Sequence, residues 1–408
     1  MSSTRWCALV WLGCWLSTAA AQVQRVDGGV NIGSTHRLWS TELTESRRVF
    51  VYLPERYAES HQRYPVMYLL DGEMHFHHAT GAVQFLATNG RIPEMIVVGI
   101  SNTDRKRDLT PSTGVASDLK EDPTAGGADR FLKFMVDELA PWVEAHYRTA
   151  PFRILVGHSL GGLLDIYALA TRPNDFQAYI AISPSLWWDD MHYVDRAKLA
   201  FPSLESPHFL YLSWCDQEDM IARSSQELAG WVTAHPLEGL VFAAHYYPGE
   251  THSTTPHRSL YDGLEMIYAG WKLPYDPDDE KQLPDLAAVE THFAALSKRF
   301  GYHIDPTVDA LNDVGRNAIA QHDYPRAVTI LEHAAALYPE SDSVQETLGK
   351  ALEGSARLDE ALEAYQRALA LVVEGESPYG EVDDYRNDIA ALQRRRVAAR
   401  LVRPNSPR

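Results

Sequence analysis

The strongest chemical signal in the sequence is the segment 157–162, which reads Gly-His-Ser-Leu-Gly-Gly. It follows the apolar stretch Ile154–Val156 and precedes a helical pattern, so the order is strand, Gly-x-Ser-x-Gly, helix. Side chains at the glycines that flank the serine would collide with the neighbouring backbone. The turn exposes the Ser159 hydroxyl and directs the first helical amides at the reacting atom. The pattern predicts a nucleophilic serine.

A serine hydroxyl is a weak nucleophile and needs a general base. His252 is the predicted base, because it follows an apolar run and a Pro-Gly turn and precedes a helical pattern with Pro256 in its first turn. His257 is the alternative, although we expect it inside that helix.

The acid that orients the histidine should follow the preceding strand, where three carboxylates compete. Such an acid commonly comes three residues after a small residue at the strand end, and Cys215 takes that place. Glu218 is therefore the predicted acid, with Asp216 and Asp219 as alternatives. The chain order serine, acid, histidine matches α/β-hydrolases and not the trypsin or subtilisin orders.

Two backbone amides are needed to stabilise the oxyanion that forms during acyl transfer. Leu160, next to the serine, supplies one, and Glu73, after the early strand that ends near Leu70, is expected to supply the other.

The elements that must position these groups alternate between short apolar runs and amphipathic segments. Arg130–His146, Leu160–Ala170 and Ser224–Thr233 have helical spacing. The predicted strands, rich in Val, Ile, Tyr and Phe, are Val49–Leu53, Val66–Leu70, Met95–Ile100, Arg153–Val156, Ala178–Ile182, Phe209–Leu212 and Val241–Tyr246. This alternation predicts an α/β-hydrolase fold, with a mostly parallel sheet flanked by helices. A long connection, Asn102–Asp129, is expected to wall the site.

Four motifs together resemble the esterase D / enterochelin-esterase-like family, whose members include siderophore and feruloyl esterases. The motifs are Leu-Asp-Gly at 70–72, the serine segment, Ser-Pro-Ser-Leu-Trp-Trp at 183–188 and Gly-Glu-Thr-His at 249–252. The resemblance covers about residues 30–270 and implies the same catalytic residues and oxyanion amides. Within its motifs we expect substrate contacts from Asp71, Gly72, His158, Trp187 and Trp188.

The remaining third of the chain is predicted to be helical. After a proline-rich acidic stretch, small and apolar residues recur 34 residues apart, as Gly315 with Gly349 and Ala327 with Ala361 do. The predicted organisation is a signal peptide at 1–21, a catalytic domain at 22–272, a linker at 273–288, tetratricopeptide-like repeats at 289–376 and a helix or tail at 377–408. The repeats either recognise a protein partner or cap the catalytic domain.

The net charge, the N-terminal segment and the histidines limit which partners, location and cofactors the protein is expected to have. The net charge of -18 disfavours nucleic acid as a partner. Arg5, an apolar run to Leu16 and small residues at Ala19 and Ala21 predict an exported protein, without a later membrane-spanning segment. His75, His77 and His78 have metal-ligand chemistry, but no partner spacing supports a metal site, so neither metal nor other cofactor is expected.

These observations predict a serine carboxylic-ester hydrolase that works through an acyl-enzyme. A siderophore lactone, an aryl ester and a short-chain ester are all compatible substrates. Acyl transfer by the same residues, or a non-catalytic repeat-containing binding protein, are the alternatives.

Overall fold

The structure, a computed structural model, describes residues 31–402 except 56, 58–60, 205–206, 217–218, 277–278, 280–282 and 373–380. The predicted signal peptide at 1–21 lies outside the described residues, as does Glu218. From Gly33 onward the contacts of the chain group it into one unit.

The strands form one sheet, which within the described residues has eight members in the order β1-β2-β4-β3-β5-β6-β7-β8. The strands are β1 (Ser34–Ser40), β2 (Glu45–Tyr52), β3 (Tyr64–Leu69), β4 (Ile96–Ile100), β5 (Thr149–His158), β6 (Ala178–Ile182), β7 (His208–Cys215) and β8 (Leu240–Tyr247). The pairs β1–β2 and β2–β4 are antiparallel, and every pair from β4 to β8 is parallel. The predicted mostly parallel sheet is confirmed.

Helices connect the strands, and after β8 the described elements are all helices. Around the sheet lie α1 (Gly72–Thr88), α2 (Arg105–Leu109), α3 (Ala116–Glu121), α4 (Ala128–Lys133), a π-helical turn (Phe134–Leu139), α5 (Ala140–His146), α6 (Leu160–Thr171), α7 (His192–Ala200), α8 (Asp219–Ala234) and α9 (Thr255–Ile267). The C-terminal helices are α10 (Leu286–Phe300), α11 (Val308–Ala320), α12 (Tyr324–Leu337), α13 (Asp342–Gly354), α14 (Leu358–Leu371) and α15 (Glu381–Val402).

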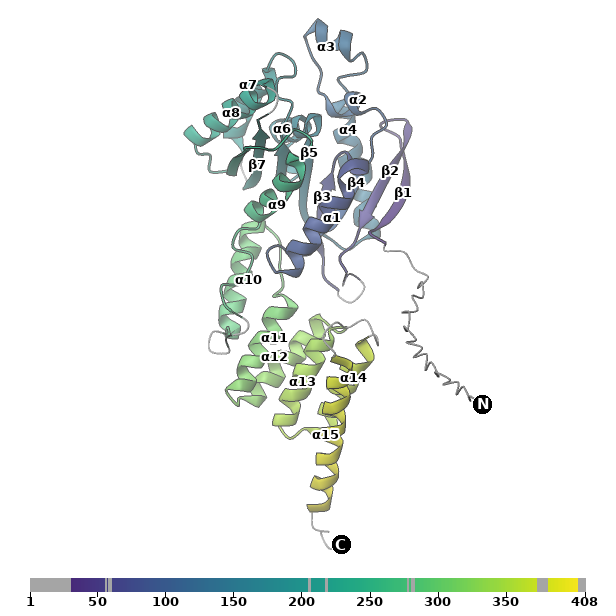
Figure 1. Cartoon of the computed structure of the whole chain (residues 1–408), viewed down its shortest axis with the longest axis vertical. Helices are drawn as coiled ribbons and strands as arrows, with labels where there is room; N and C mark the ends of the chain where they lie inside the picture. The colour runs from purple at the N-terminus through teal and green to yellow at the C-terminus, as the bar shows by residue number, and fades with distance from the viewer. Residues whose placement is uncertain are drawn as a thin grey trace, which may run out of the picture. The chain divides into compact units, whose positions relative to one another are not determined.

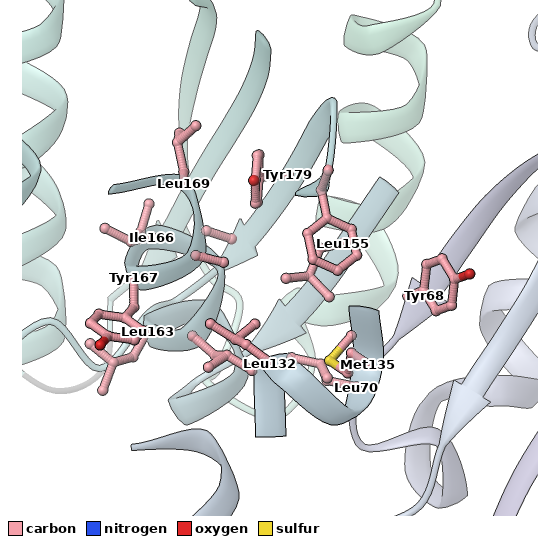
Figure 2. Close-up of a cluster of buried hydrophobic side chains, with 14 of the residues drawn as sticks. Tyr68, Leu70, Leu132, Met135, Leu155, Leu163, Ile166, Tyr167, Leu169 and Tyr179 are labelled. Atoms are coloured by element: carbon pink, nitrogen blue, oxygen red, sulfur yellow. The ribbon is translucent and has the colours of Figure 1, made fainter. Parts of the chain in front are cut away.

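The sheet is buried on both faces, which is why its central strands are apolar throughout. Because side chains alternate along a strand, Tyr68 joins one core with α4 to α8, and Met67 joins the other core with α1, α9 and α10. Figure 1 shows helices such as α1, α6 and α9 beside the strands. Figure 2 shows part of the first core, where side chains of α6 such as Leu163 and Ile166 lie among those of the neighbouring strands.

The seven predicted strands all occur within a few residues of their expected ends, but three other regions of the chain differ from expectation. β1 has a polar sequence and is an edge strand, so it lacks the apolar run by which the others were found. The segment after Gly72, for which no helix was predicted, forms the 17-residue helix α1. The long connection contains the short helices α2 and α3.

The predicted 34-residue repeat has a physical counterpart in the way its helices pack. A Cβ at Gly315 would lie 2.5 Å from Leu331, and a Cβ at Gly349 would lie 2.6 Å from Tyr365. The equivalent alanines Ala327 and Ala361 are completely buried. Small residues therefore stand where one helix of each pair approaches the other closely.

The helix α10 joins the sheet to the helices that follow it. It begins at Leu286, within the stretch 273–288 that was predicted as a linker. Its apolar side chains share one core with β3 and α9 and with residues of α11 and α12. No helix in the described ranges has the length and apolarity to cross a bilayer.

We expect Phe300→Ala to lower the free energy of unfolding by about 3–5 kcal/mol, measured by urea denaturation. Phe300 is 5% exposed, and its ring centroid lies 5.3 Å from that of Phe152 and 5.1 Å from that of Tyr268. Phe85→Ala, at a side chain that is 59% exposed, is the control and should change stability by less than about 1 kcal/mol. Equal losses would contradict this packing account.

Candidate active site

The predicted strand-turn-helix is present, and Ser159 occupies the turn between β5 and α6. Its backbone has φ 63° and ψ -115°, a conformation that is strained for a residue with a side chain. The Ser159 N–H donates to the carbonyl of Ile182 at 2.9 Å, and its own carbonyl accepts from the N–H of Ser185 at 3.0 Å. Two bonds to the β6 side therefore hold this turn.

The glycines around Ser159 are not equivalent. A Cβ at Gly157 would lie 2.2 Å from the carbonyl carbon of Gly161, and a Cβ at Gly162 would lie 2.9 Å from the Cβ of Pro184. Gly161 has room, because its nearest contact would be Leu70 at 3.4 Å. The predicted collision is therefore found for the glycine before the serine, whereas Gly161 contributes the backbone with which it would collide.

Ser185, to which the sequence analysis assigned no role, is a neighbour of the predicted nucleophile. Its Oγ lies 3.2 Å from the Oγ of Ser159. It belongs to the Ser-Pro-Ser motif after β6. That motif was the feature of the sequence from which a position near Ser159 could have been predicted.

The predicted base lies beside the nucleophile turn. His252 is half-buried in the turn between β8 and α9, and its ring centroid is 4.4 Å from that of His158, the residue before Ser159. The alternative, His257, is exposed within α9, as expected, and its ring lies 5.4 Å from that of His78.

Of the candidate acids, Asp216 is the one whose contacts the structure describes. Its Oδ2 accepts the N–H of Gly249 at 2.9 Å, and its Oδ1 accepts the hydroxyl of Tyr246. Asp216 thus ties the loop after β7 to the turn before His252. Asp219 begins α8, and Cys215 is a buried free thiol at the end of β7.

The two residues predicted to supply oxyanion amides are each in the first turn of a helix. Leu160 begins α6, and Glu73 is the second residue of α1. First-turn amides have no acceptor within their own helix, so they can donate to a ligand. Gly72 has no space for a side chain, since a Cβ there would lie 2.7 Å from the carbonyl carbon of Gly99.

The other predicted contact residues differ in their accessibility. Asp71 is 1% exposed, and its carboxylate accepts hydrogen bonds from Arg105 and Asn102. Trp188 is also 1% exposed and donates its indole N–H to the carbonyl of Pro111, so it packs in the core. Trp187 is half-buried beside that core.

A row of histidine rings begins at His252, the predicted base. The rings approach in the order His252, His158, His75, His78 and His257, with neighbouring centroids 4.4 to 5.7 Å apart. His75, His78 and His158 also line one small pocket. Burial, and then the neighbouring His252, lowers the pKa of His158 to about 3. The His158 ring is therefore neutral at ordinary pH.

The same histidines bear on the metal site considered from the sequence. Among the described residues, no group of three or more His, Cys, Asp or Glu side chains is placed to hold a metal ion. The Nδ1 of His75 lies 3.0 Å from the Nε2 of His78, as in a hydrogen bond between neutral rings.

We expect His78→Gln to reduce the loss of stability at acid pH. Burial, followed by the charges of His75 and His257, lowers the pKa of His78 from 6.5 to about 4. Between these values the unfolded chain binds one more proton than the folded chain, so stability falls as the pH drops, by about 1.4 kcal/mol per pH unit. Urea denaturation from pH 7 to 4 should show a shallower slope for the variant. His235→Gln, at an exposed histidine outside this cluster, is the control. An equal slope in both variants would contradict the account.

Comparison with known proteins shows which family the chain resembles. The family described as "Putative esterase" matches residues 40–216. The siderophore triacetylfusarinine C esterase of Aspergillus fumigatus is 30% identical, and the match covers 51% of this chain and 82% of that protein. The ferri-bacillibactin esterase of Bacillus subtilis is 38% identical over 31% of this chain and 49% of its own length.

A solved structure extends the similarity to the fold. An IroE-like serine hydrolase from Shewanella oneidensis is 34% identical with a TM-score of 0.66, and the match covers 74% of this chain and 98% of that one. The sheet order, the nucleophile turn and these matches agree. The chain belongs to this esterase family and is an ester hydrolase with the α/β-hydrolase fold.

Proposed function

We propose that this esterase cleaves carboxylic esters through an acyl-enzyme carried by Ser159. The observation that supports it best is the strained turn, which holds the Ser159 backbone at φ 63° directly before the first amide of α6. A serine in such a turn projects beyond the strand ends, where a substrate carbonyl can approach it.

The reaction divides into two halves. Ser159 Oγ forms a bond to the ester carbonyl carbon while His252 takes its proton, and the amides of Leu160 and Glu73 stabilise the oxyanion. The carbon–oxygen bond of the ester then breaks, and His252 returns the proton to the leaving alcohol. Water, activated by His252, attacks the acyl-enzyme and releases the acid and the free serine.

We assign Glu218 as the acid that orients His252, in preference to Asp216. Both carboxylate oxygens of Asp216 already accept hydrogen bonds, from Tyr246 and from the Gly249 amide. An acid in the triad must accept the imidazole N–H of the base, whereas the hydrogen bonds described for Asp216 come from Tyr246 and Gly249.

For the substrate, we propose an ester bond of a siderophore. Two relatives bear the names of siderophore esterases, for triacetylfusarinine C and for ferri-bacillibactin. The aromatic Trp187 is half-buried after β6, the strand whose following loop also provides Ser185.

The division of the chain into functional segments is also a proposal. We assign residues 1–21 as an export signal, 22–272 as the catalytic domain and 289–376 as helical repeats, with a tail at 377–408. We propose that the repeats cap the catalytic domain, because α10 shares its core with both the sheet and α11. Recognition of a protein partner is the second role for them.

We expect Ser159→Ala to lower kcat/KM by about three orders of magnitude or more, measured with p-nitrophenyl butyrate and with ferric triacetylfusarinine C. Ser203→Ala, at an exposed serine of another loop, is the control and should behave as the wild type. Turnover of the simple ester alone would contradict the siderophore proposal. Equal turnover by both variants would show that Ser159 is not the nucleophile.

A further inference from the structure

The two amides proposed to hold the oxyanion come from different turns of the chain. Glu73 follows β3 and Leu160 follows β5, two strands that pair in parallel. A parallel register fixes the strand ends, but the amides lie beyond them, in the first turns of α1 and α6. Some contact outside the sheet must therefore set their separation to the fraction of an ångström that oxyanion binding requires.

Arg105 makes the contact that spans both turns. Its Nε donates to Asp71 Oδ1 at 2.7 Å, and its Nη2 donates to Asp71 Oδ2 at 2.9 Å. The same Nη2 donates to the backbone carbonyl of His158 at 3.1 Å. A guanidinium presents these donors in one rigid plane, so it fixes direction as well as distance.

Asp71 is the residue that passes this constraint to the Glu73 amide. It adopts a left-handed conformation, with φ 52°, directly before α1, and its carbonyl accepts the N–H groups of Met74 and His75. Burial alone would raise the pKa of its carboxyl, but the hydrogen bonds and charge of Arg105 outweigh burial and hold the pKa below its usual value. An ionised, buried carboxylate is therefore pinned at the start of the helix.

Asn102 completes the connection on the Glu73 side. Its Nδ2 donates to Asp71 Oδ1 at 2.6 Å and to Glu73 Oε1 at 2.9 Å, and its backbone N–H donates to Glu73 Oε2 at 3.2 Å. The loop after β4 thus holds the start of α1 by both a side chain and the backbone.

Arg105 is itself held by the helix on which it lies. The carboxylate of Asp104 accepts the N–H of Arg107 at 3.1 Å and caps α2. Asp108, at the other end, is buried against Arg47. These contacts anchor the base of the Arg105 side chain independently of a substrate.

We propose that Arg105 is a positioning residue that sets the distance between the Leu160 and Glu73 amides, through its paired bonds to Asp71 and its bond to the His158 carbonyl. The inference rests on the proposed function, because it assigns Arg105 to the oxyanion site of that reaction. Arg105 acts through the two turns and need not touch the substrate.

The test compares Arg105→Lys and Arg105→Ala with Lys106→Gln, a change at an exposed lysine of the same helix that pairs with Asp122. Lysine keeps the charge beside Asp71 but cannot span both turns. Kinetics with p-nitrophenyl butyrate give kcat and KM, and inhibition by butylboronic acid reports binding of a tetrahedral adduct. Thermal unfolding of each variant shows whether it is folded.

We expect kcat to fall by about tenfold for lysine and about 100-fold for alanine, since loss of one oxyanion donor costs about 100- to 1,000-fold. Boronate affinity should fall in parallel while KM stays within about twofold, because an oxyanion contact forms only in the transition state. Lys106→Gln should match the wild type.

Three results would overturn the inference. A raised KM with unchanged kcat would make Arg105 a direct substrate contact, and unchanged kcat and boronate affinity in folded variants would leave it without this role. If the wild type hydrolysed no ester, the proposed function would fail and the inference with it. If the wild type hydrolyses the ester and the Arg105 variants keep its kcat and boronate affinity, the inference is wrong but the proposed function stands.

Discussion

The structure depends above all on the close approach of the backbone at Gly157 and Gly161. A Cβ at Gly157 would lie 2.2 Å from the Gly161 carbonyl carbon, so the chain can reverse from β5 into α6 only without a side chain there. That reversal forces Ser159 to a positive φ, which costs on the order of 1–3 kcal/mol. Hydrogen bonds from the β6 side and the buried helix α6 stabilise the strained turn.

The remaining groups gather around this turn because the carboxyl ends of parallel strands meet at one edge of the sheet. The sheet does not fix the positions of the loops beyond the strand ends. Two sets of hydrogen bonds between neighbouring loops do so. Arg105 joins the turns after β3 and β5, and Asp216 joins the loop after β7 to the turn after β8 that precedes His252. The ring of His158, whose pKa is lowered by burial, lies neutral beside the ring of His252.

Much of this arrangement could be predicted from local sequence. The apolar runs gave the central strands, and the glycine pattern gave the nucleophile turn, because each reflects packing within a few residues. The edge strand β1 was missed because it is polar, and α1 was missed because His75, His77 and His78 interrupt its apolar spacing. The bond between Arg105 and Asp71 joins residues 34 positions apart, so no local pattern could reveal it.

Ester hydrolysis by this protein depends on Ser159 as an activated nucleophile. The most direct test treats the folded protein with diisopropyl fluorophosphate and maps the adduct by peptide mass spectrometry. A serine needs an activating base and an oxyanion site to react, so we expect one adduct, on the peptide that contains Ser159. An adduct on another residue, or no adduct under conditions that label a known serine esterase, would contradict the account.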